Sequence, residues 1–172
     1  TKRPDGKKMD EARKMSAKVG VVKNADGSAS FTIGGTTAIA AVYGPRELYP
    51  KFMQNPQKGI LRCNYNMMSF SVDERIRPGP SRRSKEISLV TEKALLPALQ
   101  LDQFPNSVVD VFVEIVQADA GTRCAGICAA SMALADAGIP MKDLVCAISV
   151  GRVGGTVLVD LDKLEEDFED GS

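Results

Sequence analysis

The sequence predicts an α+β fold, with mixed sheets packed on helices in the order β-α-β-α. Short apolar and β-branched runs separated by glycine turns indicate strands over residues 18–70. Two longer segments, at 84–99 and 122–137, carry apolar or small residues in patterns typical of helices. At 172 residues and 44% hydrophobic composition, we expect residues 1–172 to form a single domain around one core.

The first strands are expected to form an antiparallel meander, because extended runs alternate there with turn residues. The predicted strands cover 18–22, 31–33 and 37–43, with turns at 24–28 and 34–35. A further extended run covers 60–70, and alternation along it puts Arg62, Asn64 and Asn66 on one face. Such a polar face is either solvated or binds a ligand.

The first helix follows a rigid loop, Pro78-Gly79-Pro80, which cannot lie inside a helix because proline lacks a backbone N–H. Ser84 is the expected N-cap, since a serine hydroxyl accepts a hydrogen bond from the first turn. Apolar residues at helical spacing continue to Leu99, and Pro97 is expected to kink the helix.

The second half is predicted to hold a core strand, a closely packed helix and a pair of strands. Alternating apolar residues predict the core strand at 109–115. Small residues over 122–137, ending at Gly138, predict a helix packed on more than one side. Residues 144–150 and 156–161 flank a glycine turn and are expected to pair.

Composition excludes several classes of chemistry. Basic and acidic residues number 22 each, so a nucleic acid must be bound by a local cluster, not by overall charge. The absence of histidine excludes histidine acid-base catalysis and histidine metal ligands. Cys124 and Cys128 lack further ligands for a metal, and we expect the four cysteines to fill the core.

We expect a soluble, cytoplasmic protein without membrane contact. No run approaches the roughly 18 apolar residues that span a bilayer, and the polar N-terminal residues lack the apolar segment of a secretion signal.

A basic cluster surrounds the Pro-Gly-Pro loop and leads into the first helix. It comprises Arg75, Arg77, Arg82, Arg83 and Lys85. Guanidinium groups pair with phosphate, and a helix start adds free N–H groups and a positive dipole end. The cluster suits an RNA backbone, although a solvated basic loop is an equal alternative on this pattern alone.

The junction before the second helix reads Asp119-Ala120-Gly121-Thr122-Arg123. Glycine permits close backbone approach, and the first-turn amides of a helix point at a bound anion. The motif would bind inorganic phosphate, although a threonine N-cap beside an exposed arginine explains it equally well.

The C-terminal stretch is acidic, through Asp160, Asp162, Glu165, Glu166, Asp167, Glu169 and Asp170. Close carboxylates hold Mg²⁺ or carry a proton. Most acidic runs are merely solvated, so a role in metal binding or proton transfer would be favoured only if this stretch lies beside the phosphate motif.

Taken together, these stretches resemble the RNase PH family. Residues 117–123 (Gln-Ala-Asp-Ala-Gly-Thr-Arg) and 129–141 resemble its phosphate-binding core. Residues 40–47 and 70–84 resemble, within that family, the catalytic ring subunits of archaeal exosomes. The resemblance runs over essentially the whole chain.

The resemblance implies a phosphorolytic 3′-to-5′ exoribonuclease that releases nucleoside diphosphates from single-stranded RNA. It implies that Gly121, Thr122 and Arg123 bind the attacking phosphate and that Arg123 acts in catalysis. It also implies that Arg82, Arg83 and Lys51 bind RNA, Lys51 near the neck that threads the strand. Implied partners are a related inactive ring subunit in a heterohexamer and RNA-binding cap proteins.

The catalytic carboxylate has two candidates. Asp167 best matches the first of the family's paired aspartates and would be the catalytic and Mg²⁺-binding residue. The spacing from Asp160 is one residue longer than expected, so Glu166 is the alternative. Relatives continue well beyond the match to Ser172, so we expect a domain incomplete at its C-terminus.

Two rival functions stay open at this stage. One is a bacterial-type RNase PH that trims transfer-RNA ends, and the other is a non-catalytic ring subunit that only binds RNA.

Overall fold

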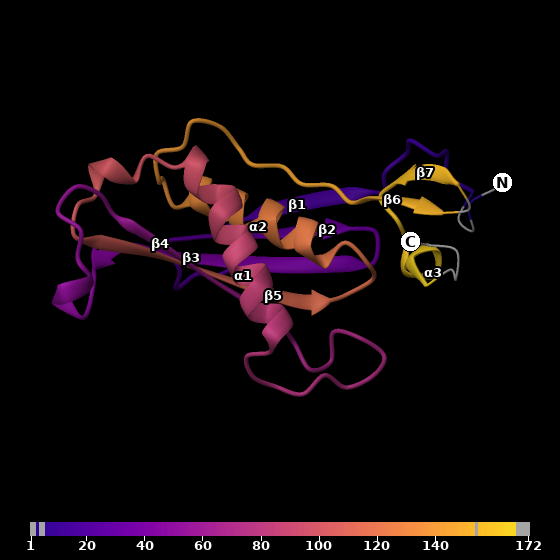
Figure 1. The fold of residues 1–172 in the computed structure, drawn as a ribbon, viewed down its shortest axis with the longest axis horizontal. Coiled ribbons are helices and arrows are strands. Elements are labelled where there is room, and N and C mark those ends of the chain that lie inside the picture. The colour runs from indigo at the N-terminus through magenta and orange to yellow at the C-terminus, as the bar shows by residue number, and fades with distance from the viewer. Residues whose placement is uncertain (1–2, 4–5, 154, 168–172) are drawn as a thin grey trace.

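The computed structural model describes residue 3, residues 6–153 and residues 155–167. Its main sheet has five strands in the order β1-β2-β3-β5-β4 (Figure 1). These are β1 (Met15–Val19), β2 (Gly27–Ile33), β3 (Thr36–Glu47), β4 (Ile60–Met67) and β5 (Ser107–Gln117). The first three strands form the expected antiparallel meander, and β4 runs parallel to β5. The predicted α+β class with a mixed sheet is confirmed.

Two helices cover one face of this sheet (Figure 1). α1 (Arg82–Leu95) connects β4 to β5, and α2 (Thr122–Asp136) follows β5. The core lies between helices and sheet, where alternate strand residues are buried: Ala38, Ala40 and Val42 in β3, and Val111, Val113 and Ile115 in β5. A Cβ added at Gly27 would lie 2.5 Å from the carbonyl oxygen of Ala133, so small residues let α2 approach the sheet closely.

The opposite face of the sheet is polar where β4 meets β5. Arg62 donates to Asp110 at 2.7 Å, and Asn66 donates to Glu114 at 2.9 Å. The polar face predicted for Arg62, Asn64 and Asn66 is therefore present, and two of its side chains pair with the neighbouring strand.

A small second unit lies at one end of the main sheet (Figure 1). Its hairpin consists of β6 (Val150–Val153) and β7 (Thr156–Val159), paired antiparallel. The short helix α3 (Lys163–Glu166) follows, with Asp162 as N-cap in a capping box that Glu165 completes. Short 3-10 helices cover Lys51–Met53, Leu96–Ala98 and Leu101–Gln103.

The start of α1 differs from the sequence prediction. Ser81, not Ser84, is the N-cap, and its hydroxyl accepts from the Ser84 N–H at 3.0 Å. Ser84 returns a hydrogen bond from the Ser81 N–H at 2.8 Å, which makes the reciprocal capping box. Arg82 and Arg83 therefore lie inside the first helical turn, where the helix dipole favours anions.

Three other predicted elements also differ. β1 lies three residues earlier than 18–22, because its residues pair with β2 from Met15↔Ile33 to Val19↔Ala29. Pro97 does not kink α1, which ends at Leu95 before a 3-10 turn. Most of 144–150 is extended but not a strand, because its N–H groups at Val145 and Ala147 are bound by Ser131 Oγ and Cys128 Sγ of α2.

None of the helices in the described ranges is long and apolar enough to cross a membrane.

Candidate active site

The turn between β5 and α2 is shaped to leave helix amides open. Ala120 and Gly121 both have positive φ, of 56° and 68°, and Gly121 is the N-cap of α2. Within the described part of the chain, no side chain caps this end of the helix. The first-turn N–H groups of α2 and the positive end of its dipole therefore face the adjoining pocket.

Arg13 and Thr36 hold this turn from behind. The Arg13 guanidinium donates to the carbonyl oxygen of Asp119. Thr36 Oγ1 donates to the Ala120 carbonyl at 2.6 Å and accepts from the Asp119 N–H at 2.9 Å. Because these contacts occupy the turn's carbonyls, its open amides are fixed on the pocket side.

Arg13 also ties the turn to the second unit through Asp160. Its Nε and Nη2 each lie 2.9 Å from an Asp160 carboxylate oxygen, and both side chains are buried. Burial raises the pKa of Asp160, but the hydrogen bonds and charge of Arg13 outweigh it, so this pKa lies below its ordinary value. Asp160 is therefore a structural anion.

A second buried arginine positions α3. Arg3 makes a two-fold contact with Glu165, at 2.8 Å and 2.9 Å, and donates to the Asp160 carbonyl at 2.8 Å. Glu165 immediately precedes Glu166, the last residue of α3, and Asp167, its C-cap. The ion pair thus fixes the segment that carries both candidate carboxylates.

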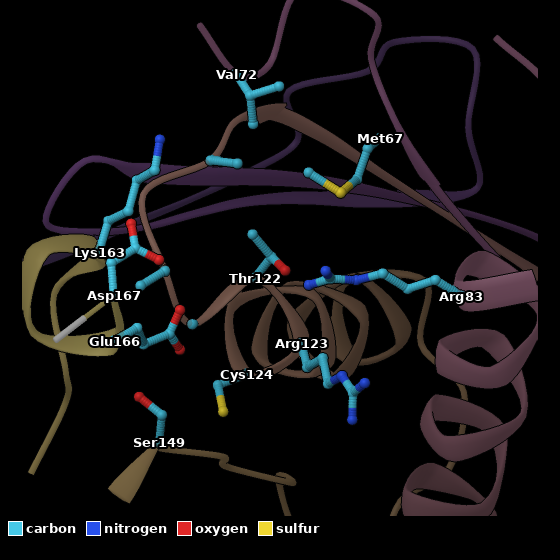
Figure 2. Close-up of a pocket in the computed structure, with 13 residues that line it drawn as sticks. Met67, Val72, Arg83, Thr122, Arg123, Cys124, Ser149, Lys163, Glu166 and Asp167 are labelled. Atoms are coloured by element: carbon cyan, nitrogen blue, oxygen red, sulfur yellow. The ribbon is translucent and has the colours of Figure 1, made fainter. Parts of the chain in front are cut away.

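The pocket formed by these elements has a volume of about 330 Å³ and opens beside the start of α2 (Figure 2). Its lining includes Arg83, Gly121, Thr122, Arg123, Ser149, Lys163, Glu166 and Asp167. In Figure 2, the side chains of Glu166 and Asp167 extend from α3 on one side, and that of Arg83 extends from α1 on the other. One cavity therefore combines cationic groups, helix amides and two carboxylates, the combination that phosphoryl transfer needs.

The structure brings most of the predicted site residues together. Gly121, Thr122, Arg123, Arg83 and Asp167 all line the pocket, and so does Glu166. Their chemical roles stay predictions.

Two predicted RNA-binding residues lie outside this lining. Arg82 is exposed in the first turn of α1 but is not part of the pocket wall. Lys51 is exposed in the 3-10 helix Lys51–Met53, in the loop after β3. Both remain available to a longer ligand that extends beyond the pocket.

Arg123 forms an ion pair with Glu86 of α1. Its Nη2 lies 3.3 Å from Glu86 Oε1, and both side chains are about half exposed. Figure 2 shows its guanidinium directed away from the carboxylates. Because exposed ion pairs contribute little free energy, Arg123 can exchange this partner for a bound anion at small cost.

Asp119 lies outside the lining but belongs to the same electrostatic network. Burial and the neighbouring Asp162 carboxylate raise the pKa of Asp119, while Arg13 and Lys163 act against this rise. Asp162 is also the N-cap of α3. The β5–α2 turn and α3 are therefore coupled electrostatically through Asp119 and Asp162.

Sequence reasoning missed the residues that assemble the site. Arg3 and Arg13 belong to a polar N-terminal stretch, and nothing local to them indicates burial. Their partners follow 162 and 147 residues later. Lys163 and Ser149 were also missed, since neither belongs to a recognisable motif.

Comparison with known proteins agrees with this geometry. Residues 11–140 match domain 1 of the 3′ exoribonuclease (RNase PH) family, and residues 143–172 match its domain 2. The exosome complex component Rrp41 of Thermococcus kodakarensis is 58% identical over 167 residues, which cover 97% of this chain and 67% of that protein. Rrp41 of Pyrobaculum neutrophilum is 54% identical, over 98% of this chain and 69% of that protein.

Solved structures show the same fold. Rice Rrp46 superposes with a TM-score of 0.85 at 30% identity, over 95% of this chain and 75% of that one. A chain of the Archaeoglobus fulgidus exosome with RNA bound to the active site also gives 0.85, at 26% identity, over 98% and 74% of the two chains. On the extent of these matches, the chain belongs to the RNase PH family of 3′ exoribonucleases.

Proposed function

We propose that this chain is the catalytic-type ring subunit of an archaeal exosome, which shortens single-stranded RNA from its 3′ end by phosphorolysis. The observation that carries the proposal is the pocket in which Arg83, Thr122 and the α2 amides face Glu166 and Asp167. The similar archaeal proteins are exosome components, and one similar solved structure is an exosome with RNA at its active site.

The reaction follows from the charges in this pocket. An oxygen of hydrogen phosphate attacks the phosphorus of the last phosphodiester, and the bond to the preceding 3′ oxygen breaks. The products are a nucleoside diphosphate and an RNA that is shorter by one nucleotide. Such a transfer depends mainly on positioning and charge neutralisation, which Arg83, Arg123 and the α2 amides can supply.

The carboxylates of Glu166 and Asp167, at the C-terminal end of α3, would transfer the proton of the attacking phosphate. The hydrogen of the attacking phosphate ends on the departing 3′ oxygen, and Asp167 or Glu166 can carry it there. If Mg²⁺ takes part, the same two side chains would hold it together with phosphate oxygens, a donor set that Mg²⁺ commonly uses. The metal would neutralise charge on the transferring group.

The proposed partners follow from the family and from the exposed loop after β3. Lys51 and Phe52 lie in this loop, and Phe52 is 87% exposed. The loop also exposes Tyr49 and Met53, and we assign it to the RNA path or to a neighbouring ring subunit, since an exposed apolar patch commonly marks a contact surface. The proposed assembly is a cytoplasmic heterohexamer with an inactive relative and RNA-binding cap proteins.

The test is to assemble the ring from this protein and its partner and to supply an unstructured oligoadenylate. Phosphate-dependent release of ADP supports the proposal. Release of AMP without phosphate would indicate hydrolysis, and an intact ring that binds RNA without releasing nucleotide would indicate a scaffold. Strong trimming by a homohexamer of this chain would favour the transfer-RNA-trimming alternative.

A further inference from the structure

Tyr65 places a buried hydroxyl group between the starts of α1 and α2. The side chain is 2% exposed and comes from β4, whose N–H at Tyr65 donates to Ser88 Oγ of α1 at 2.9 Å. Ser88 Oγ in turn donates to the Ser84 carbonyl at 2.7 Å. The position of Tyr65 is therefore tied to the first turns of α1.

The Tyr65 ring packs against α2, and its hydroxyl is near enough to Thr122 for that side chain to affect its pKa. A Cβ built at Gly126 would lie 3.4 Å from Tyr65 Cε2, so the ring lies against α2 where glycine leaves room for it. Thr122 is one turn earlier on the same helical face, because residues four apart are neighbours. Burial raises the pKa of Tyr65 by more than the nearby Thr122, Arg83 and Arg123 side chains lower it, so Tyr65 stays a hydrogen-bond donor at neutral pH.

Although Thr122 lies near enough to affect this pKa, the Tyr65 hydroxyl makes no hydrogen bond of ordinary distance and angle with any described residue. Burying a polar group without a partner costs free energy, so such a group in a native protein needs an explanation, and a role in ligand binding is one. Thr122 lines the pocket and has one donor and two acceptor sites on its hydroxyl. It can accept from Tyr65 only when its own hydrogen is directed elsewhere.

We propose that Tyr65 is a positioning residue that acts through Thr122: it donates to Thr122 Oγ1 and so directs the Thr122 hydroxyl hydrogen at a phosphate oxygen in the pocket. This inference rests on the proposed function and deepens it. Hydrogen bonds in such a chain strengthen one another, so the contact to the ligand is stronger with Tyr65 in place. The ligand oxygen belongs either to inorganic phosphate or to the terminal phosphodiester of RNA.

The test is Tyr65→Phe in the assembled ring, with phosphate varied at saturating RNA and RNA varied at saturating phosphate. We expect the KM of the ligand that Thr122 contacts to rise about threefold to tenfold, the effect of losing one neutral hydrogen bond. The KM of the other ligand should stay unchanged, which identifies the source of the oxygen. The matched control is Tyr43→Phe, because Tyr43 packs beside Phe112, away from the pocket, with ring centroids 5.9 Å apart.

Two further measurements distinguish a positioning role of Tyr65, acting through Thr122, from a purely structural one. Without phosphate or RNA, Tyr65→Phe should melt no lower than the wild type, because it removes an unpartnered hydroxyl. On a Thr122→Val background, Tyr65→Phe should have no additional effect on either KM. Unchanged KM values for Tyr65→Phe, or an equal rise in KM with and without Thr122→Val, would overturn the inference about Tyr65. Either result leaves the proposed function supported as long as the wild-type ring releases ADP in a phosphate-dependent manner. Wild-type protein without that release would reject both.

Discussion

Arg13 and Asp160, 147 residues apart in the chain, form a buried two-point ion pair with both N–O distances at 2.9 Å. The Arg13 side chain also holds the carbonyl of Asp119, so one guanidinium joins the β5–α2 turn to the strand end at Asp160. The pair therefore fixes the relative position of the two walls of the pocket.

Breaking this pair should destabilise the protein in a pH-dependent manner. Asp160→Asn should lower the free energy of unfolding at pH 7 by about 3–5 kcal/mol, the cost of leaving a buried charge without its partner. The folded-state pKa of Asp160 is lowered, so its contribution is present above the unfolded pKa of about 3.9 and is lost as pH falls through the folded value.

Urea unfolding at pH 7 and at pH 3 measures this effect. The difference between the wild type and Asp160→Asn should shrink at pH 3. Asp10→Asn, at an exposed position, is the control. A difference of equal size at both pH values would contradict the assigned ion pair.

Asp162→Asn should bring the pKa of Asp119 down. Asparagine keeps the N-cap of α3 but removes the negative charge that, next to burial, raises the pKa of Asp119. Burial remains, so the pKa should fall only part of the way toward its ordinary value. Carbon-13 NMR titration of the Asp119 carboxyl measures this change, and an unmoved titration would show that the two carboxylates are not coupled.

The ends of helices and strands are predicted well from the sequence where local residues set them, and poorly where pairing with distant residues sets them. α2 is predicted within one residue because Gly121 and Gly138 delimit it locally. The N-cap of α1 was misplaced because Ser81 and Ser84 both serve in one capping box, and local sequence does not rank them. β1 was misplaced because pairing with β2, and not its own composition, sets its ends.

The site was predicted in its motifs but not in its assembly. Arg83, Thr122 and Arg123 belong to recognisable local patterns, and the structure brings them into one pocket. The buried roles of Arg3 and Arg13 depend on partners more than a hundred residues away. No local pattern distinguishes a basic residue that will be buried from one that stays solvated.

Asp167 and Glu166 can be separated by matched substitutions. We expect Asp167→Asn to lower ADP release by about two to four orders of magnitude, the usual contribution of a proton-transferring group, and Glu166→Gln to lower it by much less. Both changes keep size and remove charge, so they differ only in position. Single-turnover assays of the assembled ring measure ADP release by both variants. A larger loss for Glu166→Gln than for Asp167→Asn would assign the catalytic role to Glu166.

In the proposed function, this pocket binds the attacking phosphate and Arg123 stabilises the transition state. Arg123→Ala should lower phosphate-dependent ADP release by about two to three orders of magnitude, comparable to deleting one oxyanion donor. RNA affinity at one fixed salt concentration should fall much less, because Arg82, Arg83 and other basic groups still neutralise the backbone.

The most direct measurement is ADP release by the assembled ring that carries Arg123→Ala, compared with the ring that carries Arg152→Ala. Arg152 is exposed on β6 and does not line the pocket. We expect a large loss of release for the first variant and wild-type release for the second. Unchanged release by Arg123→Ala would contradict a role of Arg123 in the phosphate-dependent reaction.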